Sequence, residues 1–229
     1  MGIRGWGFGI WDWKLVLSNF QPRQRRWQIS NLLIIAMFLL VGCSSVEPVV
    51  KVGLVGPFEG EHRAIGYDVI YSARLAVREI NEAGGIAGHR VALVALDDGG
   101  DVALAEQTAV SMSIDPGVVA VIGNWLPENT AVAGDIYAQH QLPFIPMGEP
   151  PFGQNDDLPF EFIQAYEAVT PFDETAGPYA GSTYDAFQLL WQAMAESETI
   201  NGEINRDGVA KALSYLEYKG ITGTVFVSE

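Results

Sequence analysis

Short apolar runs alternate with amphipathic stretches along the first two thirds of the chain. Apolar runs of β-favouring residues that stop at glycine, proline or aspartate predict buried strands at residues 51–57, 91–96, 118–123 and 142–147. Apolar residues at helical spacing predict helices between them, at residues 64–83, 101–114 and 128–140. Asp101 is a credible N-cap of the second helix. Strands that alternate with helices predict an α/β fold, a three-layer doubly wound and mainly parallel sheet covered on both faces.

The last third of the chain has a different pattern. A connection rich in proline, glycine and aspartate covers residues 148–159. Helical patterns follow at residues 160–169, 176–197 and 206–216, and a short final strand is expected at residues 222–228. We find no repeat and no low-complexity tract. The length is enough for one core of common domain size, so residues 51–229 are expected to form a single domain.

The start of the chain resembles an export signal. Arg23, Arg25 and Arg26 precede an uncharged apolar run at residues 32–41, which is too short to span a bilayer comfortably. The run ends in Leu-Val-Gly-Cys at residues 40–43, and a small residue before a cysteine is typical of lipoprotein processing. We therefore expect residues 1–43 to be a lipoprotein signal peptide that ends at a lipidated Cys43, followed by a tether at residues 44–50. The alternative is a signal anchor with an ordinary buried cysteine.

The net charge and the absence of known motifs argue against nucleic-acid binding and against several classes of enzyme. The 229 residues carry a net charge of -15, and residues 43–229 hold 8 basic and 27 acidic side chains, so nucleic acid is an improbable partner. No dinucleotide fingerprint, phosphate loop or nucleophile elbow is present. His62, His89 and His140 are scattered over different turns, and Cys43 is the one cysteine. We expect no cofactor, no metal site and no enzyme activity, although a paired Asp/Glu site, as in an acidic-site hydrolase, stays open.

Three stretches carry a resemblance to a known family. They are residues 52–57 leading to the run Glu-Ile-Asn-Glu-Ala-Gly-Gly-Ile-Ala-Gly at 79–88, residues 121–123 with 143–146, and residues 179–186 with Gly-Ile-Thr-Gly at 220–223. They resemble the type I periplasmic binding proteins of branched-chain amino-acid and amide ABC transporters, and they follow that family's order. Members of the family have two lobes around a ligand, in a chain roughly twice as long. The sequence resembles an amino-terminal lobe whose pieces have been rejoined across residues 148–159.

The resemblance also implies where a ligand would bind. In the family, the carboxylate of an amino acid meets backbone N–H groups and Ser or Thr hydroxyls at helix starts. The matching loops give these candidate ligand-binding residues: Phe58, Glu59, Ile65, Asn124, Trp125, Leu126, Asn129, Thr130, Met147, Gly148 and Glu149. Most of the hydroxyls are missing, and Glu149 stands about where the family offers Thr or Ser. A carboxylate there would repel the carboxylate of an ordinary amino acid.

Several of these side chains also have a plainer interpretation. Trp125 is either a stacking wall for a small ligand or an apolar surface left bare without a second lobe. We expect Glu128 to stabilise the start of its helix through the helix dipole. We expect Asp97 and Asp98 to cap a turn instead of binding a metal. Tyr184 and Asp185 are expected to pack and cap within a long helix.

The sequence therefore predicts an extracytoplasmic solute-binding lobe, anchored to a membrane by lipid, that serves an ABC permease. The expected ligand is a small polar solute or an amino-acid-like molecule, bound weakly unless a second lobe or a second copy supplies the other wall. The alternative is an interaction or sensory module that docks a protein on a former cleft face containing Phe58, Trp125, Met147 and Phe152.

Overall fold

The computed structural model describes residues 47–171 and 174–227. The expected signal peptide, Cys43 and the first part of the tether lie outside these residues, so those expectations remain predictions. Glu47 to Glu229 form a compact unit of their own. None of the described helices is both long and apolar enough to cross a membrane.

A four-stranded parallel sheet forms the centre of this unit, with the strand order β2-β1-β3-β4. Its strands are β1 (Val49–Gly56), β2 (Arg90–Asp97), β3 (Val118–Gly123) and β4 (Phe144–Pro146). Every residue of β3 is buried, as expected for an apolar run covered on both faces. All four strands lie within the runs that the sequence predicted or extend one by one or two residues.

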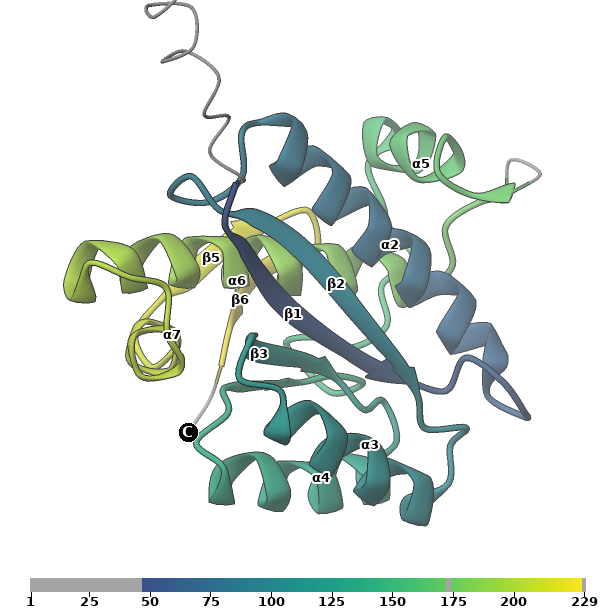
Figure 1. The fold of residues 1–229 in the computed structure, drawn as a ribbon. Coiled ribbons are helices and arrows are strands. Elements are labelled where there is room, and N and C mark those ends of the chain that lie inside the picture. The colour runs from purple at the N-terminus through teal and green to yellow at the C-terminus, as the bar shows by residue number, and fades with distance from the viewer. Residues whose placement is uncertain (1–46, 172–173, 228–229) are drawn as a thin grey trace, which may run out of the picture. The chain divides into compact units, whose positions relative to one another are not determined.

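Helices cover both faces of the sheet (Figure 1). One face carries α3 (Val102–Ile114) and α4 (Pro127–Gln139), whereas α2 (Arg63–Glu82) and α6 (Ala180–Asn201) lie on the other. The helices α5 (Phe160–Glu167) and α7 (Arg206–Leu213) complete the unit. The predicted cap is present, because the Asp101 carboxylate accepts a hydrogen bond from the N–H of Leu104 at 2.9 Å. The three-layer α/β fold is confirmed.

Alternate residues of the strands point into two separate hydrophobic cores, one on each face of the sheet. Val52 and Leu54 of β1 point to the α2 and α6 face, and Val55 points to the α3 and α4 face. This division follows from the two-residue period of a strand, because successive side chains point to opposite faces. The sheet is therefore held from both sides by apolar packing.

The helices after residue 159 pack onto the elements that precede them. Helix α6 is buried on almost every side, and its apolar residues join the core cluster of β1, β3 and α2. Helix α5 packs on α2, where the Tyr71 and Tyr166 rings meet edge to face with centroids 6.3 Å apart. The second half of the chain thus closes the layer that the first half leaves open.

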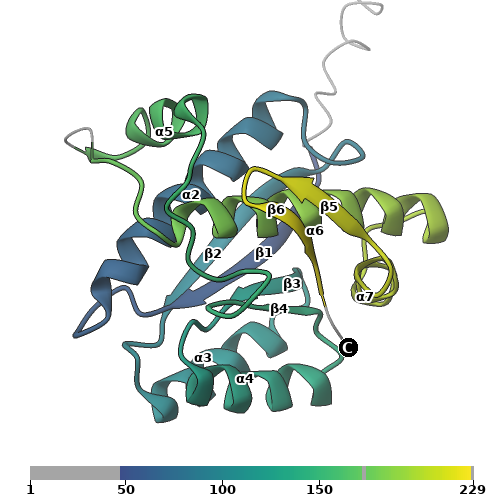
Figure 2. The ribbon, with the colours of Figure 1, turned by 180° about the vertical axis from the view of Figure 1, so that it is seen from behind.

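The predicted C-terminal strand is present as β6, but it pairs with a strand that the sequence did not predict. The structure has a separate antiparallel hairpin of β5 (Glu217–Gly220) and β6 (Gly223–Phe226), and helix α7 ends at Leu213 instead of residue 216 (Figure 2). Asp185, expected to cap its own helix, holds the hairpin turn. Its carboxylate accepts hydrogen bonds from the N–H groups of Ile221 at 3.0 Å and Thr222 at 2.8 Å. Burial raises the pKa of Asp185, while these hydrogen bonds act in the opposite direction.

One arginine joins helix α7 to the amino end of β3. The Arg206 guanidinium donates to the backbone carbonyls of Val118 at 2.9 Å, Asp115 at 2.8 Å and Ser113 at 3.2 Å. Since Arg206 is the first residue of α7, this contact fixes that helix against the end of α3 and the start of β3. It is a second link between the two halves of the chain.

A partly buried carboxylate lies where α2 meets the start of α6. The Asp68 side chain accepts a hydrogen bond from the N–H of Tyr179 at 3.4 Å. Burial raises the pKa of Asp68 from 3.8 to about 6, although backbone N–H groups of Tyr179 and Gly177 oppose the shift.

The Asp68 carboxyl should make stability depend on pH. Between about pH 4 and pH 6 the folded state keeps a proton that the unfolded chain has released, so the free energy of unfolding falls as pH rises through this window. Because the side chain is partly exposed, we expect a loss of about 1 kcal/mol. Asp68→Asn should remove this loss, which urea unfolding at pH 4 and pH 7 would measure. The same pH difference in both proteins would contradict the assignment.

Asp185→Ala should loosen the hairpin, because two backbone N–H groups lose their acceptor. We expect the free energy of unfolding to fall by about 2 kcal/mol in urea denaturation. Asp156→Ala, at an exposed loop position, is the matched control and should stay within about 0.5 kcal/mol of the parent. If both variants unfold at the same urea concentration, the carboxylate does not hold the turn.

Candidate functional site

The carboxyl ends of the parallel strands meet at one edge of the sheet, where ligand sites of such folds lie. Four connections reach this edge, at residues 57–62, 98–101, 124–126 and 147–159. They contain most of the residues that the sequence singled out.

Two aspartates at the end of β2 shape the loops instead of facing a ligand. The Asp97 carboxylate accepts hydrogen bonds from the N–H groups of Phe58 at 2.8 Å and Gly99 at 2.9 Å. Asp98 is only 1% exposed, and its carboxylate accepts from the N–H of Gly100 at 3.0 Å and the Asn124 amide at 2.8 Å. Within the described part of the chain, no group of three or more His, Cys, Asp or Glu side chains could hold a metal. The turn-capping interpretation of both residues fits this geometry.

Asn124 links this network to the end of β3. Its backbone lies in the left-handed region, with φ at +48°, which Asn adopts more readily than most residues. Its N–H donates to the carbonyl of Val55 at 2.8 Å, and its side chain is fully buried against Asp98. Asn124 therefore supports the loop from inside and does not lie on an open surface.

The polar groups expected to meet a ligand after β3 are directed inward. The Thr130 hydroxyl donates to the backbone carbonyls of Asn124 at 2.7 Å and Leu126 at 3.0 Å. Asn129 is 1% exposed, and its amide nitrogen has no hydrogen-bond partner. A hydroxyl already bound to two carbonyls is a poor donor for a ligand carboxylate.

Trp125 is a core residue at this edge. Its side chain is 4% exposed, and its ring lies against Gly56, where a side chain would collide with it. Gly148, with φ at +93°, backs onto the Trp125 carbonyl and leaves no room for a Cβ atom. Met147 and Phe152 are equally buried. The expectation of a bare apolar surface at Trp125 is therefore wrong, because its side chain belongs to the core cluster that also contains Met147 and Phe152.

A pocket of about 420 Å³ lies beside these residues, between the start of α4, the turn after β4 and the C-terminal hairpin. It brings together four predicted residues: Trp125, Thr130, Met147 and Glu149. Its other lining residues are Pro127, Ala131, Pro146, Pro150, Pro151, Phe152, Phe226 and Val227. Phe226 and Val227 come from the far end of the chain, so a prediction based on neighbouring loops could not include them.

The remaining predicted residues do not line this pocket. Phe58 is half-buried, Glu59 is exposed, and Ile65 packs from the first turn of α2 against the core. Leu126 lies close to Gly100. Glu128 is exposed in the first turn of α4, as its helix-dipole interpretation requires.

The pocket has an uneven charge. Glu149 is exposed and is the only charged side chain in the lining, and most of the remaining wall is apolar. A carboxylate that enters would find no cation among these residues, whereas an ammonium group would find Glu149. The arrangement suits an apolar group that carries a positive charge.

Comparisons with known proteins agree with this fold. Residues 49–161 match the family model described as periplasmic binding protein. A Leu/Ile/Val-binding protein homolog of Brucella melitensis is 28% identical over 196 residues, which cover 85% of this chain and 51% of the relative. The Leu/Ile/Val-binding protein of Escherichia coli is 29% identical over 149 residues, covering 62% and 39%. The chain thus spans about half the length of the curated relatives it matches.

Solved structures show the same architecture. The branched-chain amino-acid substrate-binding protein LivJ from Streptococcus pneumoniae, in complex with isoleucine, has a TM-score of 0.65 at 14% identity, covering 78% of this chain and 91% of that one. A branched-chain amino-acid ABC transporter protein from Rhodospirillum rubrum gives 0.66 at 15% identity, covering 78% and 96%. At such low identity these matches support the fold alone. Together with the family model and the curated relatives, they show that the chain is similar to periplasmic binding proteins.

Proposed function

We propose that this chain is an extracytoplasmic solute-binding lobe, anchored through Cys43, that delivers a small ligand to an ABC permease. The family match and the relatives named as Leu/Ile/Val-binding proteins support a binding function over an enzymatic one. The pocket beside Glu149 carries the proposal, because it lies at the carboxyl edge of a parallel sheet.

The ligand is an amino-acid-like molecule held by its side chain and its ammonium group. Its apolar side chain would contact Ala131, Pro151 and Phe226, and its ammonium group would face Glu149. Its carboxylate has no cationic partner in this lining, so that group would point toward solvent or toward a second wall. The negative charge of Glu149 therefore sets the orientation of the ligand, because it repels the ligand's carboxylate and attracts its ammonium group.

Affinity for the lone lobe should be weak. Ligand sites normally bury about 70 to 90% of a small ligand's surface, and a single wall covers less. A second lobe, a second copy of the chain or the permease would complete the enclosure. The lobe alone would then act as a low-affinity receptor.

A protein-docking role has one observation in its favour. Phe226 is 42% exposed at the rim of the pocket, so an apolar segment of a partner could contact it. However, Trp125, Met147 and Phe152, which were expected to form such a face, are buried. This leaves a small apolar surface, and solute binding is the better supported function.

A comparison of matched ligands tests the orientation. We expect 3-methylbutylamine to raise the melting temperature of residues 44–229 by about 3 °C at ten times its Kd, with leucine giving no larger rise at the same concentration. 4-Methylpentanoate, which has a carboxylate and no ammonium group, should give no rise. Glu149→Gln should reduce the response to the amine, because it removes the only charged group of the lining.

Two alanine-to-phenylalanine variants on α4 test whether the ligand binds in this pocket. Ala131→Phe fills the pocket and should abolish the response to the amine, whereas Ala138→Phe, exposed on the same helix outside the lining, should keep it. An equal response to the amine in both variants, or equal stabilisation by the acid and the amine, would contradict the proposal. A flat response to every ligand, together with a dimer in light scattering, would favour protein docking.

A further inference from the structure

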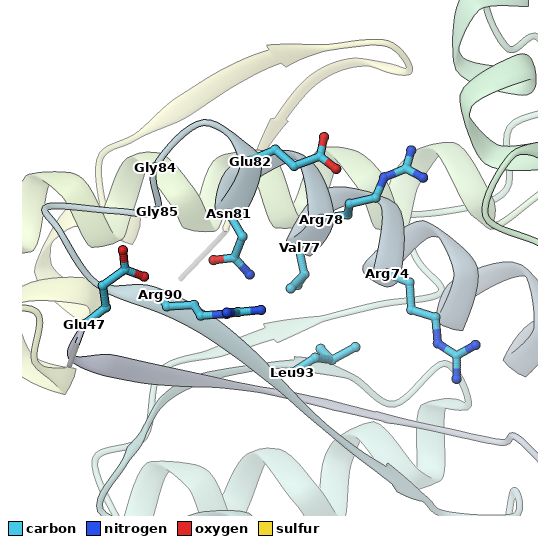
Figure 3. Close-up of a pocket in the computed structure, with 10 residues that line it drawn as sticks. All are labelled: Glu47, Arg74, Val77, Arg78, Asn81, Glu82, Gly84, Gly85, Arg90 and Leu93. Carbon is cyan, nitrogen blue, oxygen red and sulfur yellow. The ribbon is translucent and has the colours of Figure 1, made fainter. Parts of the chain in front are cut away.

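A larger hollow, of about 520 Å³, lies far along the sheet from the solute pocket, between α2 and the amino end of β2. Arg74, Val77 and Arg78 line it from α2, and Arg90 and Leu93 line it from β2. Figure 3 shows the three arginines extending from these two elements, with Val77 and Leu93 between them. We call this hollow the arginine pocket.

The walls of the arginine pocket are fixed in place. Residues 74, 77, 78 and 81 share one face of α2 because they are three or four positions apart. Asn81 ties this face to β2, since its amide donates to the carbonyl of Val91 and its carbonyl oxygen accepts from the N–H of Val91, both at 2.8 Å. Because β2 is an edge strand, no other strand of residues 47–171 and 174–227 fills the space beside it. The hollow is therefore a consequence of the fold.

Positive charge is concentrated here in an otherwise acidic protein. Three of the eight basic residues between positions 43 and 229 line this one hollow, and all three are exposed. Among the described residues the one ion pair within 4.0 Å is Lys51–Asp115, so none of these guanidinium groups is paired with a carboxylate. The Arg74 guanidinium lies over the Tyr71 ring, 5.3 Å from its centroid. A contact with a ring face leaves N–H donors that can bind an anion, and guanidinium donors match the oxygens of a phosphate.

Two carboxylates complete the lining. Glu82 follows Asn81 on α2, and Glu47 lies near Gly85 at the other end of the view from Arg74 (Figure 3). A ligand with a phosphate and an ammonium group would find partners for both charges. When the phosphate is a diester, as in a phospholipid headgroup, such a ligand has no net charge, so the long-range field of the acidic protein does not repel it.

We propose that the arginine pocket binds the phosphoethanolamine headgroup of a membrane phospholipid. Glu47 is four residues from Cys43, and an extended chain of that length reaches at most about 14 Å. This step rests on the anchor in the proposed function: a lipidated Cys43 would hold the pocket near a headgroup layer. The arginines would contact the phosphate, and Glu47 or Glu82 would contact the ammonium group.

Sedimentation with vesicles tests the pocket separately from the anchor and from the solute site. The protein is residues 44–229, which lacks Cys43 and contains all three core clusters. We expect it to sediment with vesicles of phosphatidylcholine and phosphatidylethanolamine more than with vesicles of phosphatidylcholine alone. Arg74→Gln with Arg78→Gln should weaken this binding by about tenfold, because two phosphate contacts are lost.

The matched control removes the same charge elsewhere. Lys211→Gln with Lys219→Gln, both exposed and outside the pocket, should bind as the parent does. Circular dichroism should show that both double variants fold, since all four positions are exposed.

Equal sedimentation with the two kinds of vesicle, or an unchanged arginine variant, would overturn the proposal. Stabilisation by inorganic phosphate without vesicle binding would overturn the lipid assignment in favour of a free phosphate. The melting-temperature response to 3-methylbutylamine is measured separately, so a failure of the lipid site can be told apart from a failure of the solute site.

Discussion

The burial of helix α6 against the sheet and α2 holds the two halves of this chain in one body. Phe187, Leu190 and Met194 of α6 are fully buried in the cluster that also contains β1 and β3. Each such side chain contributes roughly 1.5–3 kcal/mol when it leaves water, and lengthening a loop by a few residues costs far less. The connection at 148–159 can therefore join the halves without a second lobe between them. Asp185 and Arg206 then fix the hairpin and α7 around this core.

The sequence predicted the regular part of the fold because each strand and helix has its own apolar period. The hairpin was missed for a physical reason. Strand β5 reads Glu-Tyr-Lys-Gly and has a mostly exposed pattern, so its conformation depends on Asp185 at the turn instead of on apolar alternation. The fold class is confirmed, and the short strand expected at residues 222–228 is present as β6, whereas its partner β5 was not predicted.

The side-chain arrangement of the candidate site could be predicted only in part from the neighbouring sequence. The family resemblance implied the ligand loops, but it could not give the directions of their side chains: Trp125, which follows the left-handed Asn124, is buried. The pocket also needs Phe226 and Val227, which reach it only through the hairpin. Glu149 could be recognised in advance because its charge departs from the family's pattern.

The central claim is that residues 44–229 fold as one cooperative body. The two tryptophans of this segment report on different parts of it, Trp125 at the site edge and Trp191 in α6. Trp125→Phe and Trp191→Phe leave one reporter each, and urea unfolding can be followed by fluorescence and circular dichroism. Within each variant, fluorescence and circular dichroism should give coincident single transitions. A Trp191 signal that changes at lower urea concentration than the circular dichroism of the same variant would show that α6 does not hold the halves together, and would contradict the account.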